Sequence, residues 1–273
     1  MEHLMSSYFG VPLYTLTMLA LILVVSAVMS GLSGFGFSAI GAASLWLLPP
    51  TLAVPLLMAL STANQLLSVQ QLKAEMKPWR EWWPDGPGVY IFGGLLGVPV
   101  GVWLLHALPT ATLMVAFGML LMVYSVYSIR KPDSLFIYRH IGWPVSALVG
   151  ALGGVIGGFT AFPGAAVVIW TGLVTRRKNE IRAIVQPYIL ALQIVALLLL
   201  WVNHPETFDA QFWGLLGIML PFVLPGTLLG LRLYRNLSEV NFKRIALVML
   251  GVSGMGLFLK GLATTVRSAA ALL

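Results

Sequence analysis

The chain of 273 residues contains no cysteine, which excludes disulfide bonds, thiolate metal sites and cysteine nucleophiles. Charged residues are also scarce, at 9% of the chain, whereas hydrophobic residues make up 59%. So few charges cannot cover the surface of a soluble globule of this size. With a mean hydropathy of +0.91, the composition indicates an integral membrane protein without a sizeable soluble domain.

Motifs of the common hydrolases and of ATP-driven transport are missing as well. The sequence has no Walker A pattern, no HExxH pair and no GxSxG elbow, so these enzyme classes have no support. The four histidines, at positions 3, 106, 140 and 204, are scattered at segment ends. We therefore expect no enzyme, with neither catalytic residues nor a metal nor a cofactor.

Apolar segments separated by polar connections follow one another along the whole chain. They cover residues 11–30, 38–48, 52–72, 89–106, 110–129, 141–157, 163–174, 181–201, 211–233 and 240–262. A run of about 20 apolar residues is long enough to cross a bilayer as a helix. We predict a single all-α transmembrane permease domain over residues 1–273, with about ten helical elements.

Glycine interrupts two of these segments at corresponding places. The first break, Gly31–Ser38, reads GLSGFGFS, and the second, Gly154–Ala161, reads GVIGGFTA. The shift along the chain that takes Gly31 to Gly154 also superposes the Gly-Ala-Ala runs that follow the two breaks. We predict that a broken or re-entrant pair forms the first two elements of each half. The alternative is that these glycines only permit tight helix crossing.

A second glycine motif also occurs once in each half, and its two copies are slightly further apart in the sequence than the two breaks. Gly97-x-x-x-Gly101 matches Gly226-x-x-x-Gly230, and the additional residues of the second half fall at its polar insert, 176–180. Glycines spaced by four permit close helix packing, which is our interpretation of both motifs.

The distribution of positive charge predicts how the two halves are related. Fourteen of the sixteen basic residues fall in four clusters, at 73–80, 130–139, 176–182 and 232–244. Because Lys and Arg favour cytoplasmic loops, we place all four clusters in the cytoplasm. Matching connections of the halves then lie on opposite sides of the membrane, which predicts inverted five-element repeats at about 10–130 and 140–262.

The breaks are the natural place for a binding site. Non-helical backbone in a bilayer survives only where it is buried in protein or lines a wet cavity. The helices that follow begin with exposed N–H groups and a positive dipole end, which favour an anion without a charged side chain. The candidate substrate-binding residues are Ser33, Gly34, Gly36, Ser38, Asn64, Gln65, Gly157, Gly158, Thr160, Gln186 and Gln193. For each buried amide, a hydrogen bond between helices is an equally good interpretation.

The paired breaks, each followed by a Gly-x-x-x-Gly-x-x-Leu element, resemble the TauE/SafE sulfite-exporter family, also called the toluene-sulfonate uptake permease family. The resemblance covers nearly the whole chain, although residues 159–163 of the second break are less glycine-rich than the family pattern. It implies a multi-pass permease of the bacterial inner membrane for a small sulfur-containing oxyanion, such as sulfite or an organosulfonate. Export is the direction that it favours.

Together these patterns predict a secondary transporter that works by alternating access, with the anion held at helix N-termini near the bilayer midplane. No Asp, Glu, Lys or Arg falls clearly at the centre of a predicted span. We therefore expect the anion to be bound by backbone, hydroxyl and amide groups, without a fixed cation. The expected partners are this anion and the lipid bilayer, with no nucleic acid, and a homo-oligomer is compatible with the sequence. The alternatives are a passive anion channel and a membrane-embedded enzyme or assembly subunit.

Overall fold

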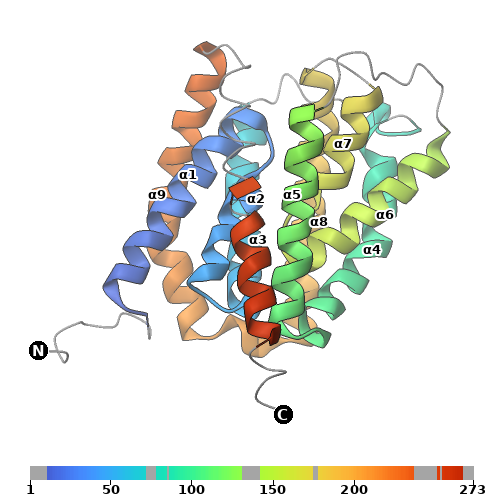
Figure 1. Ribbon diagram of the computed structural model, residues 1–273. Helices are drawn as coiled ribbons and strands as arrows, with labels where there is room; N and C mark the ends of the chain where they lie inside the picture. Colours follow the sequence, from blue (N-terminus) through green and yellow to red (C-terminus); the bar gives the residue numbers. More distant parts are fainter. Residues whose placement is uncertain are drawn as a thin grey trace, which may run out of the picture.

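The computed structural model describes residues 11–71, 78–84, 86–130, 142–174, 178–236, 251–252 and 254–266 (Figure 1). Seven helices in it are long and apolar enough to cross a membrane. They are α1 (Leu13–Ser33), α3 (Pro50–Gln71), α4 (Pro87–Ala107), α5 (Thr110–Arg130), α6 (Trp143–Thr160), α8 (Lys178–Asn203) and α9 (Ala210–Asn236).

Three shorter apolar helices accompany the long ones. They are α2 (Phe37–Gly41) with its 3-10 continuation η2 (Ala42–Trp46), α7 (Gly164–Val174) and an unlabelled helix, Gly254–Val266. Two further 3-10 turns, η4 (Trp79–Glu81) and η5 (Pro205–Phe208), lie in connections. The prediction of an all-α chain with about ten helical elements is confirmed. The start of the predicted last segment, 240–250, lies outside the described residues.

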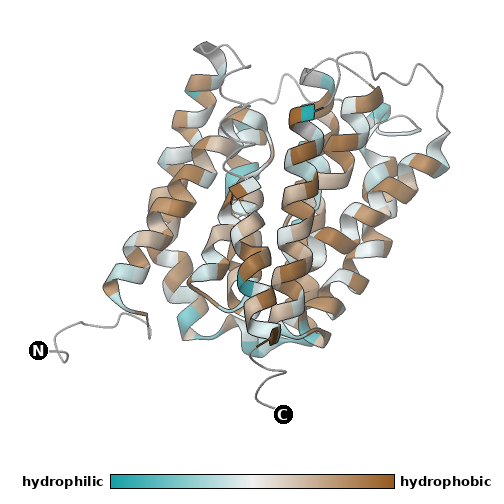
Figure 2. Ribbon diagram, viewed as in Figure 1, coloured by the Kyte–Doolittle hydropathy of each residue, from teal (hydrophilic) through white to brown (hydrophobic). Residues whose placement is uncertain are grey.

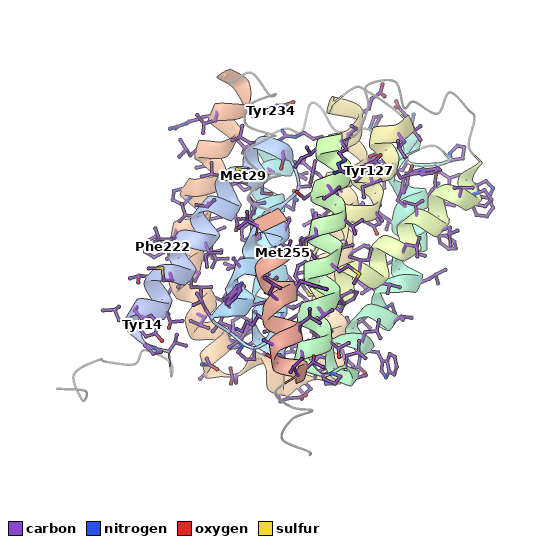
Figure 3. The ribbon with its side chains drawn as sticks, viewed as in Figure 1. Tyr14, Met29, Tyr127, Phe222, Tyr234 and Met255 are labelled. Carbon is purple, nitrogen blue, oxygen red and sulfur yellow. The ribbon has the colours of Figure 1, made fainter. Side chains whose placement is uncertain are left out.

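Large apolar side chains cover the outward faces of the helices. Figure 2 shows hydrophobic residues along most of the length of each long helix. Tyr14 on α1 and Phe222 on α9 are 59% and 50% exposed and lie on the outer side of the bundle (Figure 3). Such a surface is unfavourable in water but suits contact with lipid chains. The chain is therefore a multi-pass membrane protein.

Two pairs of long helices pack closely along their lengths, α1 with α9 and α4 with α6. Glycine allows both approaches. A Cβ atom on Gly230 would lie 3.0 Å from the Cα atom of Gly31, and one on Gly158 would lie 2.6 Å from the Cα atom of Gly101. The interpretation of the two Gly-x-x-x-Gly motifs as helix-packing sites is confirmed. The helices α3 and α8 pack against each other, and each also contacts one pair, α3 on α9 and α8 on α4.

Both breaks begin with a residue in the left-handed backbone conformation. α1 is followed by Gly34, with φ of +81°, whose N–H donates to Ser30 O at 2.7 Å. α6 is followed by Ala161, with φ of +59°, whose N–H donates to Gly157 O at 2.8 Å. This is a common way to end a helix, because it satisfies a carbonyl group of the last turn.

The last residue of each helix caps its break with a hydroxyl group. Ser33 Oγ donates to the carbonyl four residues back at 2.8 Å and accepts from the N–H two residues on at 3.3 Å. Thr160 Oγ1 makes the same two bonds at 2.6 and 3.1 Å. Each hydroxyl therefore satisfies one backbone N–H group that the break leaves without a helical partner, and binds to the helix through a carbonyl of its last turn.

The structure corrects the alignment of the two breaks. Their equivalent residues are Gly34 and Ala161, whereas the alignment of Gly31 with Gly154 pairs Gly34 with Gly157. That prediction is therefore wrong by about one helical turn. Both Gly154 and Gly157 lie inside α6, and the second break covers 161–163 instead.

The repeating character of a glycine-rich packing face explains this error. Such a face presents glycine at nearly every turn, so glycine identities can favour a register that lies one turn away from the structural one. The insert within the second half also becomes shorter, because the later motif keeps its match of Gly97 with Gly226.

Candidate functional site

A small cavity lies between the two breaks. It is lined by the start of α2, by α3 and α8, and by the second break, through Gly36, Phe37, Ser38, Ser61, Gln65, Ala161, Phe162, Pro163, Ile189 and Gln193. Its volume of about 10 Å³ is about the room that one water molecule needs. The fold therefore brings two segments that are far apart in the sequence to one small space.

Gln65 of α3 and Gln193 of α8 make matching contacts on the two sides of this cavity. Gln65 Nε2 donates to Gly34 O and Gln193 Nε2 donates to Ala161 O, each at 3.2 Å. Both acceptors are carbonyl groups of the left-handed residues. Because a carbonyl only accepts, these contacts fix the orientation of both amides. The two Oε1 atoms are buried, and neither has a hydrogen-bond partner within the described structure.

Gly36 and Ser38 form the cavity wall at the start of α2. Gly36 precedes the helix with φ of +98°, a conformation that other residues adopt at a cost of about 1–2 kcal/mol. Ser38 is 2% exposed, and its Oγ atom has no hydrogen-bond partner among the residues that the structure describes. Of the candidates from the sequence, these two residues and the two glutamines line the cavity.

Asn64 lies outside the cavity and links three helices. Its Nδ2 donates to Ser30 Oγ of α1 at 2.7 Å, and its Oδ1 accepts from Thr227 Oγ1 of α9 at 2.6 Å. Asn64 is fully buried, so both ends of its amide are used within the bundle. The interpretation as a hydrogen bond between helices therefore accounts for this residue.

A double-mutant cycle measures this link. We expect Asn64→Leu and Thr227→Val each to lower the free energy of unfolding, and the pair to show a coupling of about 0.6 kcal/mol, up to about 1.7, as for other hydrogen bonds between transmembrane helices. Thermal or denaturant unfolding in detergent checks this. Additive effects of the two changes would contradict a direct contact. Thr171→Val is a matched control, because Thr171 Oγ1 donates within its own helix.

The other six candidates also lie outside the cavity. Ser33 and Thr160 cap the breaks, and Gly34 provides the left-handed residue and the carbonyl that orients Gln65. A Cβ on Gly157 would meet Pro163 at 2.5 Å, whereas Gly158 packs on α4. Gln186 lies beside the first break, with its Nε2 3.2 Å from the position of a Cβ on Gly34.

The cavity also contains residues that the sequence reasoning missed. Ser61 precedes Gln65 by four residues and Ile189 precedes Gln193 by four, so each pair shares a helix face. That spacing could have identified both. Phe162 and Pro163 carry no polar group, and nothing in their local sequence marks them as cavity residues.

Arg182 of α8 is a buried cation beside the first break. The side chain is 3% exposed, and its Nη2 donates to Gly31 O and Leu32 O, each at 2.8 Å. The guanidinium carbon lies 4.0 Å from the centre of the Tyr234 ring on α9. A cation at the carbonyl end of α1 is favoured by the helix dipole. Arg182 therefore joins the ends of three helices.

The sequence groups Arg182 with the basic cluster 176–182, which we assigned to a cytoplasmic loop, and the structure instead buries its side chain at the start of α8. The cause is distance along the chain. The carbonyl groups that bind Arg182 belong to α1, in the other half of the sequence, so no local pattern indicates the contact. The remaining residues of that cluster, Arg176, Arg177 and Lys178, lie where no side chain is described.

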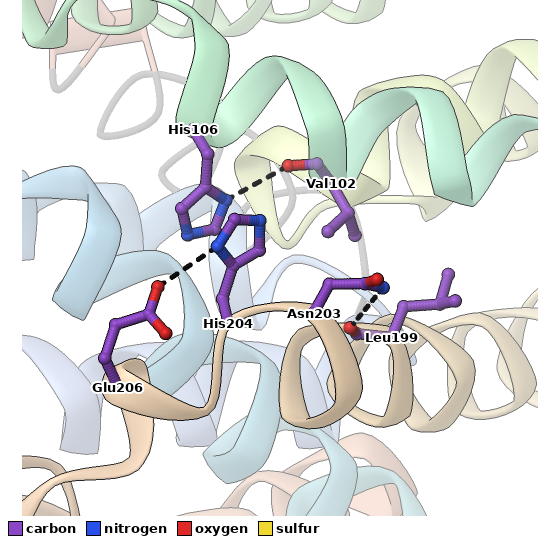
Figure 4. A network of polar contacts seen from close by, with 6 residues as sticks. All are labelled: Val102, His106, Leu199, Asn203, His204 and Glu206. Carbon is purple, nitrogen blue, oxygen red and sulfur yellow. Dashed lines mark hydrogen bonds and ion pairs between the residues drawn. The ribbon is translucent and has the colours of Figure 1, made fainter.

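At the other end of α8, two histidine rings stack face to face. His106 of α4 and His204 lie with ring centroids 3.5 Å apart and planes at 1° (Figure 4). His204 Nδ1 lies 3.1 Å from Glu206 Oε1, and His106 Nδ1 lies 3.2 Å from Val102 O. Hydrogen bonds from its own backbone N–H and from His204 lower the pKa of Glu206. These contacts connect the end of α4 to the turn after α8.

Comparison with known proteins places the chain in a family. The family model described as Sulfite exporter TauE/SafE matches residues 18–257. The matched range contains both breaks, every residue that lines the cavity, and Arg182. Comparisons with curated proteins and with solved structures gave no match.

Proposed function

The chain belongs to the Sulfite exporter TauE/SafE family, and we propose that it is a secondary transporter for a small sulfur-containing oxyanion, such as sulfite or an organosulfonate. Family membership and seven helices able to cross a membrane make it a multi-pass membrane transporter for a sulfite-like anion. The location that we propose is the bacterial inner membrane, and the direction is export.

The observation that carries the proposed site is the meeting of both breaks at one cavity. There the N–H groups at the starts of α2 and α7 supply donors and a positive dipole end. Ser38 adds a hydroxyl group, and each glutamine amide keeps a second N–H beyond the one that its break uses. These are donors that an oxyanion requires, and none of the described residues that line the cavity is acidic.

The size of the cavity makes conformational change part of the proposal. An oxyanion with three oxygens around sulfur needs more room than the volume of about one water molecule that is present. The described conformation therefore has too little room at the site for the anion. So small a space at this point of the bundle favours a transporter over a passive channel, which needs a continuous path for ions.

We propose that the opening is a rocking of two inverted repeats, at about 10–130 and 140–262. In such repeats α1 corresponds to α6, and α4 corresponds to α9. The contact between α1 and α9 therefore has the contact between α6 and α4 as its counterpart, and both contacts are present. The capping bonds of the breaks match in the same way. Arg182 and the stacked histidines lie at opposite ends of α8, where closure toward one side or the other would occur.

Flux measurements in proteoliposomes test the proposal. We expect saturable uptake of labelled sulfite that unlabelled sulfite accelerates from the opposite side, because a transporter exchanges ligand through one alternating site. Competition by sulfoacetate, taurine, thiosulfate and sulfate then ranks the substrates. Conductive flux that rises linearly with concentration, without exchange, would instead indicate a channel. Empty liposomes and liposomes that contain Gly217→Ala are controls, since a Cβ at Gly217 meets nothing within 4 Å.

A further inference from the structure

We propose that the cavity between the breaks also binds one Na⁺ ion, with Gln65 Oε1, Gln193 Oε1 and the hydroxyl oxygens of Ser38 and Ser61 as its protein ligands. The inference deepens the proposed function, because it assigns a coupling ion to the same site. It starts from the orientation of the two amides. Their Nε2 atoms face the carbonyl groups of the breaks, so their oxygens are left as acceptors.

The buried oxygens require a partner. Gln65, Gln193 and Ser38 are 1%, 2% and 2% exposed, and Gln65 Oε1, Gln193 Oε1 and Ser38 Oγ have no hydrogen-bond partner in the described part of the chain. Leaving a buried acceptor unsatisfied costs about 1–3 kcal/mol. Three such atoms belong to residues that line one cavity. A species that accepts lone pairs from several oxygens at once satisfies them together.

The volume of the cavity and the lack of charge on its lining residues indicate which cation it would bind. The cavity volume of about 10 Å³ admits about one water molecule, and a bare Na⁺ ion is smaller than a water molecule. Hard cations prefer oxygen ligands, whereas Ca²⁺ sites use carboxylates and Mg²⁺ keeps much of its water. None of the described lining residues carries a carboxylate. Neutral amide and hydroxyl oxygens at interrupted helices suit Na⁺ best.

A cation here also supplies a driving force for transport. The described residues that line the cavity include no Asp or Glu that could carry a proton with the substrate. Na⁺ between the breaks would lie next to the anion that the helix starts bind. Each ion would then reduce the cost of burying the other, which couples their binding.

Thermal unfolding of the purified full-length protein, without sulfite, tests the ion site. At constant ionic strength and chloride concentration, we expect NaCl to raise the Tm in a saturable manner, whereas KCl and choline chloride do not. The double change Gln65→Leu and Gln193→Leu, and separately Ser38→Ala, should weaken the apparent Na⁺ affinity at least about tenfold, as losses at metal sites do.

Ser44→Ala is the matched control for Ser38→Ala. Ser44 is 1% exposed and its Oγ also lacks a partner in the described structure, but it does not line the cavity. We expect its response to Na⁺ to equal that of the unchanged protein. If the double glutamine variant does not fold, Ser38→Ala and binding of ²²Na⁺ to the unchanged protein still decide the question.

The outcomes separate this inference from the proposed transport. Equal Tm values in sodium, potassium and choline, with no ²²Na⁺ bound, would mean that a water molecule fills the cavity, and the inference would be overturned. Sulfite flux that persists in sodium-free buffer under those conditions would leave the transport function intact. A Na⁺-specific Tm increase without any sulfite flux would instead support the ion site and reject sulfite as the substrate.

Discussion

Gly34→Leu is expected to abolish sulfite flux in proteoliposomes while the protein still inserts into the membrane. The residue has φ of +81°, and a non-glycine residue in that conformation costs about 1–2 kcal/mol. Its Cβ would also lie 2.7 Å from Arg182 Nε and 2.9 Å from Arg182 Cγ. Relief of this clash moves the carbonyl that orients Gln65. The first break and the cavity wall are therefore disturbed together.

Two further variants complete this test. Gly157→Leu should have the same effect at the second break, because its Cβ would lie 2.5 Å from Pro163 Cβ. Gly217→Leu is the matched control, since a Cβ there meets nothing within 4 Å, and it should transport normally. Size-exclusion profiles verify that each variant is folded. Normal sulfite flux by both Gly34→Leu and Gly157→Leu would place the binding site elsewhere.

Arg182→Gln should cause the largest loss of stability of any single change of a charged residue on α8. It removes two hydrogen bonds from a charged group to the end of α1, and each bond of this kind contributes about 1.5–3 kcal/mol. It also removes the stacking of the guanidinium on Tyr234. Thermal unfolding in detergent should show a clearly lower Tm, and sulfite flux should fall because the first break loses its anchor.

Arg182→Lys separates charge from geometry. An ammonium group keeps the charge but cannot reproduce the planar stacking or the fork of donors, so we expect an intermediate Tm. Arg232→Gln is the control, because that side chain is exposed on α9, and surface changes usually alter stability by less than about 0.5 kcal/mol. Equal Tm values for Arg182→Gln and Arg232→Gln would show that the buried contacts of Arg182 are not important.

Much of the fold follows from patterns that are local in sequence. The length of each apolar run predicts a spanning helix, and the glycines near Gly34 predict the first interruption. Gln65 and Gln193 stand out because amides are costly in a bilayer. The same property also marks Asn64, and only the partners in space show that its amide links helices. Polar residues in membrane spans can thus be found from sequence, whereas their roles depend on contacts.

The features that sequence reasoning missed depend on contacts between distant segments. The register of the breaks follows from the left-handed residues, and at the second break that residue is Ala161 rather than a glycine. Glycine identity was therefore a misleading marker of equivalence. The contacts of Arg182 join α8 to α1. The apolar neighbours of Arg182 at the start of a span are the only local sign that it is buried, and they do not indicate its partners.

In the repeat arrangement that we propose, the buried arginine has no counterpart at the matching position of the other half, so we expect the two ends of the transporter to differ in energy. The shift along the chain that superposes Gln65 on Gln193 also superposes Val54 on Arg182, and Val54 is buried as well. We therefore expect closure at one end to be held by the buried hydrogen bonds of Arg182, whereas the described contacts at the other end are the stacked histidine rings and the exposed pair of His204 and Glu206. A difference of about 1.4 kcal/mol already gives a tenfold excess of one state. The empty carrier would then rest facing one side of the membrane, and the two directions of flux would saturate at different anion concentrations.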